Sequence, residues 1–214
     1  VVQTDDIVGR LLAALDKAEL ADNTIVVFTA DNGPESYAYP RDEQYGHWSA
    51  APFRGLKRDI YEGGHHVPFL MRWPGVTQPG SVSDALVSQV DLMATFAGAI
   101  GYSLPDDAAE DSHDMLPHLR GEADRIRTSH VHNTNAKGYA IRSGDWLLID
   151  APTGYISRAD KGWLSRYGYP PDDDGEVELY NLAEDIGQRH NIAAEHPEIV
   201  RELRNLLTTI REQG

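Results

Sequence analysis

The sequence contains no cysteine among its 214 residues. This absence excludes disulfide bonds, thiolate zinc sites and cysteine nucleophiles from these residues. No apolar run approaches the roughly 20 residues that a membrane-spanning helix needs. Basic residues are also scarce, since 19 Lys and Arg face 34 Asp and Glu and leave a formal net charge of −15. Such an acidic chain is not expected to bind a nucleic-acid backbone.

Several catalytic motifs that can be recognised from spacing are missing as well. The chain has no Gly-x-Gly-x-x-Gly, no Walker loop, no Gly-x-Ser-x-Gly and no His-Glu-x-x-His. No signal peptide is visible, the first residue is Val1 rather than Met, and a helical pattern begins at once. We therefore expect the natural amino terminus to lie upstream of this chain.

The most informative stretch is 24–75, where two short apolar runs enclose a polar excursion rich in Pro and Gly. The first run, 25–28, is typical of a buried strand and is soon followed by Asp31 and Asn32. Ligands of open α/β sheets bind beyond the carboxyl ends of strands, and carboxylate and amide oxygens suit Ca²⁺ or Mg²⁺. Lys57 adds a mobile cation for an anionic substrate group. Alternatively, Asp-Asn-Gly is an ordinary turn.

Five segments of this stretch carry a larger pattern. They are Thr-Ala-Asp-Asn-Gly at 29–33, Pro-Phe-Arg-Gly-Leu-Lys at 52–57, Tyr-Glu-Gly-Gly at 61–64, Val-Pro at 67–68 and Arg-Trp-Pro-Gly at 72–75. In order and spacing they resemble the second half of the sulfatase family, within the alkaline-phosphatase-like superfamily. In that family the Asp–Asn pair ligates calcium, sometimes magnesium, and the lysine binds the sulfate ester. The resemblance implies that Asp31 and Asn32 are metal ligands, that Lys57 is a catalytic and substrate-binding residue, and that the protein is periplasmic or secreted.

The resemblance also identifies what this chain does not contain. Sulfatases use a hydrated formylglycine made from Cys or Ser in a Cys/Ser-x-Pro-x-Arg motif, and no such motif occurs here. The resemblance implies that this motif lies in a missing amino-terminal half of the fold. We expect the parent protein to hydrolyse aryl or carbohydrate sulfate esters, and the 214 residues alone to be inactive. His66 stands where the family commonly has arginine, so the role of that arginine is in doubt here.

Two other functions stay open. The parent protein would be a phosphatase or phosphonate-ester hydrolase if the metals and anion-binding groups of this superfamily served that reaction. It would be a non-catalytic protein binding sulfated glycans if it had kept the fold but not the chemistry.

The expected fold class is α/β. Residues 1–122 are expected to form part of the alkaline-phosphatase-like catalytic sheet, and residues 123–214 a small α+β subdomain. Four short strand patterns separated by turns predict an antiparallel sheet in that subdomain, with a hairpin turn at 143–145. An apolar stripe predicts a final helix over 197–212 that packs across this sheet.

Two further helices are predicted from apolar spacing and capping residues. The first covers 4–20, with Thr4 or Asp5 as its cap. The second covers 91–101, begins at Asp91 as its cap and ends near a glycine. Both helices are interpreted as structural.

A few side chains allow two interpretations. His132 is a candidate substrate contact, although a single histidine is often structural. The aromatic residues of the loop at 34–56 either line a sugar or aryl pocket or pack the loop onto the body. His65 and His66 suggest zinc, but neighbouring side chains on a strand point to opposite faces, so a two-histidine metal site is not expected there.

Overall fold

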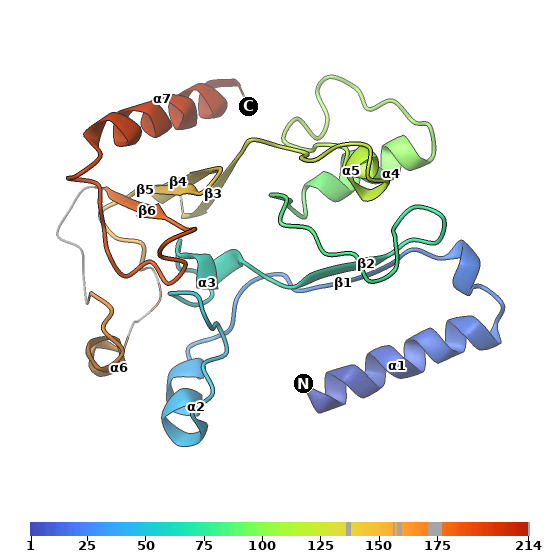
Figure 1. Cartoon of the computed structure of the whole chain (residues 1–214), viewed down its shortest axis with the longest axis horizontal. Helices are drawn as coiled ribbons and strands as arrows, with labels where there is room; N and C mark the ends of the chain where they lie inside the picture. Colours follow the sequence, from blue (N-terminus) through green and yellow to red (C-terminus); the bar gives the residue numbers. More distant parts are fainter. Residues whose placement is uncertain (136–137, 156, 158–159, 171–176, 214) are drawn as a thin grey trace.

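The computed structural model describes residues 1–135, 138–155, 157, 160–170 and 177–213. Two separate sheets organise the chain, with helices around them (Figure 1). The helices are α1 (Val2–Lys17), the short 3-10 helix η1 (Ala21–Asn23), α2 (Ala38–Tyr45), α3 (Glu62–His65), α4 (Asp91–Ala99), α5 (Leu116–Leu119), α6 (Lys161–Arg166) and α7 (Pro197–Gln213). The strands are β1 (Val26–Thr29), β2 (Phe69–Arg72), β3 (Ser129–Asn135), β4 (Gly138–Ser143), β5 (Trp146–Asp150) and β6 (Glu178–Asn181). The predicted mixed α/β class is confirmed.

The two apolar runs of the central stretch form a two-stranded antiparallel sheet. β1 pairs with β2 in the register that sets Val27 opposite Met71. The prediction that the run at 25–28 is a buried strand is wrong for this chain, because no residue of β1 is buried, and Ile25 is 37% and Phe28 is 38% exposed. Within the described residues each strand has a single hydrogen-bonded neighbour, so its second edge is free. A two-stranded sheet alone is only marginally stable, and such edges favour pairing with further strands.

The first predicted helix exists as α1 but starts before its predicted cap. Val1 occupies the N-cap position without a side-chain hydrogen bond, and Thr4 and Asp5 lie inside the helix. The capping prediction is therefore wrong, although Asp5 lies in the first turn, where the helix dipole favours a carboxylate. No residue of α1 is buried, and Leu11 on its apolar face is 52% exposed. No helix in the described ranges is long and apolar enough to cross a membrane.

The second predicted helix is α4, and its first residue has a different role from the predicted one. Val90 occupies the N-cap position, so Asp91 does not cap the helix. The buried Asp91 carboxylate instead accepts hydrogen bonds from the backbone N–H of Ser88 at 2.8 Å and of His113 at 2.9 Å. It also forms an ion pair with the guanidinium of Arg127. Asp91 thus ties the start of α4 to segments before and after it.

The carboxyl-terminal sheet follows the sequence prediction closely. Its strands pair in the order β3–β4–β5–β6, each antiparallel to the next. The predicted hairpin turn is confirmed: β4 ends at Ser143, β5 begins at Trp146, and Gly144 adopts a φ of 58°. That left-handed conformation is what a two-residue hairpin loop demands. Helix α7 covers one face of this sheet and buries Leu203 and Leu207 against it (Figure 1).

The largest hydrophobic cluster joins segments from both sides of residue 122. It includes Leu56 and Tyr61 from the central stretch, and Leu147 and Tyr180 from the carboxyl-terminal sheet. Side chains far apart in sequence therefore share one core. The division of the chain at 122 stays a prediction.

Candidate functional site

Glycines allow the motif loops of the central stretch to touch backbone to backbone. A Cβ atom on Gly33 would lie 1.8 Å from the carbonyl oxygen of Gly63, and one on Gly63 would lie 2.3 Å from that of Gly55. The backbone N–H of Gly33 also donates to the carbonyl of Gly64 at 2.9 Å. Only residues without a side chain permit such approaches. The segments after β1, before α3 and within α3 are thereby locked into one framework.

Replacing Gly33 with alanine should disturb this framework strongly. The new methyl group would collide with a backbone oxygen that cannot rotate away, so we expect a loss of about 2–3 kcal/mol in the free energy of unfolding. Urea unfolding measures this loss. Gly9 in α1 is the matched control, because nothing lies within 4 Å of its added Cβ. Gly9→Ala should be neutral or stabilising by up to about 1 kcal/mol, and an equal response of the two sites would contradict the packing argument.

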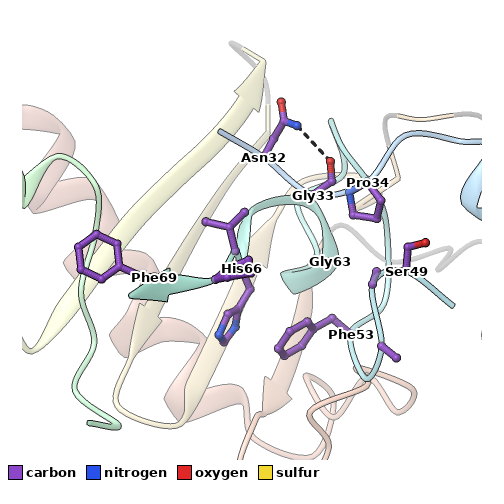
Figure 2. Close-up of a pocket in the computed structure, with 12 residues that line it drawn as sticks. Asn32, Gly33, Pro34, Ser49, Phe53, Gly63, His66 and Phe69 are labelled. Atoms are coloured by element: carbon purple, nitrogen blue, oxygen red, sulfur yellow. Dashed lines mark hydrogen bonds between the residues drawn. The ribbon is translucent and has the colours of Figure 1, made fainter. Parts of the chain in front are cut away.

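Asp31 and Asn32 lie just beyond the carboxyl end of β1. The Asn32 side-chain N–H donates to the carbonyl of Gly33 at 3.0 Å, and Figure 2 shows the amide oxygen on the side away from that bond. A carboxylate and an amide oxygen fit a hard cation, but Ca²⁺ takes six to eight oxygen ligands. In the part of the chain that the structure describes, no group of three or more His, Asp or Glu side chains is placed to hold a metal ion. The two residues fit part of a calcium site, and their metal-binding role stays a prediction.

Lys57 is attached to the same loop by its backbone and by its side chain. Its backbone N–H donates to the carbonyl of Pro34 at 2.9 Å. Its ammonium nitrogen lies 3.1 Å from Oε1 of Glu35, and about a third of the side chain is exposed. The structure therefore brings the predicted sulfate-binding lysine to the loop that begins with Asp31 and Asn32, with its side chain partly exposed.

Sequence reasoning missed two charged neighbours of Lys57. Arg58 donates from both terminal nitrogens to the two carboxylate oxygens of Glu35, at 3.0 Å each. Hydrogen bonds from Arg58 and then Lys57 lower the pKa of Glu35 to about 2. The adjacency of Arg58 to Lys57 is visible in the sequence. The pairing of both with Glu35 is not, because it depends on how two loops meet.

The ring of His132 on β3 contacts two other parts of the chain. Its Nε2 lies 3.1 Å from the carbonyl oxygen of Ile60, and its ring lies 3.8 Å from the ring of His65. Burial, and then the neighbouring His65, lower the pKa of His132 to about 3, so the ring is neutral at ordinary pH. These contacts match the structural alternative, and the substrate contact stays a prediction.

The neighbouring histidines converge on one buried carboxylate. Glu62 lies 3.5 Å from Nε2 of His65, 2.6 Å from Nδ1 of His66 and 3.7 Å from a terminal nitrogen of Arg142. Burial opposes ionisation, but hydrogen bonds from the two histidines outweigh it and hold the pKa of Glu62 far below its usual range. The prediction that His65 and His66 lie on a strand and point to opposite faces is wrong, because His65 lies in α3. Both histidines instead contact one carboxylate.

A cavity of about 460 Å³ opens beside the Asp-Asn-Gly loop. Its lining includes Asn32, Ser49, Phe53, His66 and Phe69 (Figure 2). The rings of Phe53 and His66 stack with their centres 4.2 Å apart. The wall is largely apolar with a few polar groups, as in many ligand pockets.

Two aromatic residues of the loop at 34–56 serve packing, whereas Tyr37 is 55% and Tyr45 is 71% exposed. Tyr39 is 4% exposed, and the Trp48 ring lies 5.4 Å from that of Tyr39 and 4.1 Å from that of Trp163 on α6. For these residues the packing interpretation holds. Phe53 is the aromatic residue of the loop that lines the cavity.

Comparison with known proteins identifies the family. The family model described as Sulfatase matches residues 1–102, and the model described as N-sulphoglucosamine sulphohydrolase, C-terminal, matches residues 55–150. Both matched ranges contain Lys57 and the residues around α3.

Individual relatives agree with these matches. An N-acetylgalactosamine-6-O-sulfatase of Bacteroides thetaiotaomicron is 35% identical over 219 residues, covering 99% of this chain and 41% of the relative. Steryl-sulfatase of Mus musculus is 42% identical over 137 residues, covering 63% of this chain and 22% of the relative. A solved structure of a Bacteroides thetaiotaomicron protein, described in terms of glycosaminoglycan metabolism, superposes with a TM-score of 0.81 at 34% identity, covering 98% of this chain and 43% of that chain.

The chain is a member of the sulfatase family, and its structural neighbours have the alkaline-phosphatase-like fold. It matches a carboxyl-terminal portion of that fold. The match to the Bacteroides relative includes 99% of this chain but only 41% of the length of the relative.

Proposed function

We propose that the complete protein is a sulfuric ester hydrolase in which this chain contributes Asp31, Asn32 and Lys57 to the site. The observation that carries the proposal is the attachment of Lys57 to the loop of Asp31 and Asn32, through Pro34 and Glu35, in a chain whose relatives are sulfatases. The metal ligands and the anion-binding cation thereby belong to one rigid framework.

Each residue has a distinct chemical task in this proposal. Asp31 and Asn32 supply two hard oxygen ligands to a Ca²⁺ ion, or to Mg²⁺ in its place. Such an ion, when bound, polarises the sulfate ester. Lys57 donates to the sulfate oxygens and stabilises the negative charge that builds up during S–O cleavage. The formylglycine nucleophile comes from outside this chain, so the 214 residues alone are inactive.

We further propose that the substrate is a carbohydrate sulfate. The relative that covers 99% of this chain is named for the 6-O-sulfate of N-acetylgalactosamine, whereas the steryl-sulfatase match covers 63%. The cavity beside Asn32 has a stacked Phe53–His66 pair in its wall, and aromatic faces suit the apolar face of a sugar ring. A periplasmic or secreted location, where sulfated glycans occur, accords with this substrate.

Turnover by the complete protein tests the proposal. We expect release of sulfate from N-acetylgalactosamine 6-sulfate and from 4-nitrophenyl sulfate, with much slower hydrolysis of 4-nitrophenyl phosphate. Removing divalent cations with EDTA should lower turnover at least about 100-fold, and added Ca²⁺ should restore it. Faster hydrolysis of the phosphate would indicate a phosphatase. Binding of sulfated glycan without sulfate release would indicate a non-catalytic binding protein.

A further inference from the structure

Glu35 occupies an unusual position for a partly exposed carboxylate. It follows the Asp-Asn-Gly-Pro turn and contacts two cations that come from a different loop. Its carboxylate lies 3.1 Å from the Lys57 ammonium nitrogen and 3.0 Å from each terminal nitrogen of Arg58. Glu35 is therefore the side-chain link between the loop of the metal-ligand pair and the predicted sulfate-binding lysine.

The backbone of Arg58 shows that this link is built against a conformational preference. Arg58 has a φ of 82°, in the left-handed region that residues with side chains rarely adopt. Strained backbone persists where surrounding contacts hold it, and it gathers at functional sites. With its backbone in this conformation, Arg58 makes the two-pronged hydrogen bond to Glu35.

The geometry leaves Lys57 partly available. An ammonium group has three N–H donors, and the contact with Glu35 engages one of them. As far as the described residues show, two donors remain for the oxygens of an anion. Because the forked Arg58 fixes the carboxylate, the carboxylate in turn fixes the direction in which Lys57 presents those donors.

We propose that Glu35 is a positioning residue of the sulfate site, locked by Arg58, that orients the Lys57 ammonium and moderates its attraction for free sulfate. This inference rests on the proposed function of Lys57 and deepens it. The orienting role favours turnover, because charge stabilisation in a transition state needs donors that are already in place. The negative charge of Glu35 weakens the hold of the site on the sulfate dianion that is the product.

The proposal predicts that Glu35→Gln lowers kcat and raises the affinity for inorganic sulfate. In the complete protein, kcat for 4-nitrophenyl sulfate should fall about tenfold, because the ammonium group loses its fixed orientation. Inhibition by inorganic sulfate should become about threefold tighter, because a neighbouring negative charge is removed. Steady-state kinetics with sulfate as the inhibitor measures both, and sulfate binding by calorimetry gives the affinity without turnover.

Two further variants separate orientation from charge. Arg58→Lys keeps the charge but loses the fork, so kcat should fall about threefold without tighter sulfate inhibition. Glu43→Gln breaks a similar exposed pair, in which Arg166 lies 3.0 Å from Glu43, and should leave both quantities unchanged. The melting temperature of each variant reports on folding.

These measurements test the positioning role of Glu35 separately from the proposed function. Unchanged kcat in Glu35→Gln, or a parallel loss of turnover, sulfate affinity and melting temperature, would overturn the positioning role. If the wild-type protein hydrolyses no sulfate ester, the proposed function fails, and calorimetry still decides the role of Glu35. Tighter sulfate binding in Glu35→Gln that disappears in the double variant with Lys57→Ala then supports it, and unaltered binding overturns it.

Discussion

Replacing Lys57 with alanine in the complete protein should lower kcat/KM for a sulfate ester by about 100- to 1,000-fold. The lysine is the cation that the motif loops attach to the Asp-Asn-Gly turn, by a 2.9 Å backbone hydrogen bond and a 3.1 Å side-chain contact. Removing the ammonium group deletes charge stabilisation in the transition state, while Glu35 keeps its forked partner Arg58. The loop should therefore survive the change, and the loss should appear in turnover and not in folding.

Steady-state kinetics on a 4-nitrophenyl sulfate or a hexosamine sulfate measures this effect. Lys17→Ala is the matched control, since Lys17 is an exposed lysine in the last turn of α1. The control should keep wild-type turnover. Turnover of Lys57→Ala within a few fold of wild type would refute the catalytic role of Lys57, provided that the metal-dependent activity of the wild-type protein is established in the same assay.

Local sequence patterns were sufficient to predict the β4–β5 hairpin and helix α7. The hairpin between β4 and β5 follows from a glycine that can adopt a left-handed conformation, and α7 follows from an apolar stripe that needs one sheet face. The exposure of β1 could not be derived in this way. An apolar run predicts burial, but burial needs neighbours, and within the described residues β1 has one partner strand.

Side-chain roles that depend on tertiary contacts were harder to predict. Asp91 has the position of a cap, yet it binds Arg127, which lies 36 residues later in the chain. Glu35 reads as a residue of a polar loop, and only the meeting of two loops places it against Lys57 and Arg58. For the candidate site, the motif residues were located by resemblance to a family. Their supporting partners required the structure.

One of these tertiary contacts is a fully buried ion pair. Arg54 and Glu178 have no side-chain exposure, and Nη1 of Arg54 lies 3.8 Å from Oε2 of Glu178. Arg54 also donates to the hydroxyls of Tyr155 at 2.8 Å and Tyr180 at 2.9 Å, and its guanidinium lies 3.9 Å from the centre of the Tyr61 ring. This network joins the motif loop of the central stretch to β6.

Two tyrosine hydroxyls also donate to Glu178. Tyr61 donates to one carboxylate oxygen at 3.0 Å, and Tyr180 donates to the other at 2.5 Å. Burial, and then the charge of Glu178, raise the pKa of both tyrosines well above the ordinary value. Both hydroxyls therefore stay protonated and act as donors to the carboxylate, and Arg54 is its cationic neighbour.

Arg54→Leu should consequently destabilise the complete protein by about 3–5 kcal/mol, because Glu178 would lose its Arg54 ion-pair partner in the core. Urea unfolding measures this loss. Arg204→Leu is the control: Arg204 lies 2.8 Å from Asp150, but the side chains are 41% and 35% exposed, so the cost should be below about 1 kcal/mol.

A double variant, Arg54→Leu with Glu178→Leu, tests the cause. Part of the stability should return when both charges are gone, since two apolar side chains leave no buried ion without a partner. Strictly additive losses would mean that Arg54 stabilises the core by filling space and not by pairing with Glu178. Because Arg54 lies three residues before Lys57, the same loss of anchorage should also lower turnover, so the network that joins the two parts of the chain also supports the candidate site.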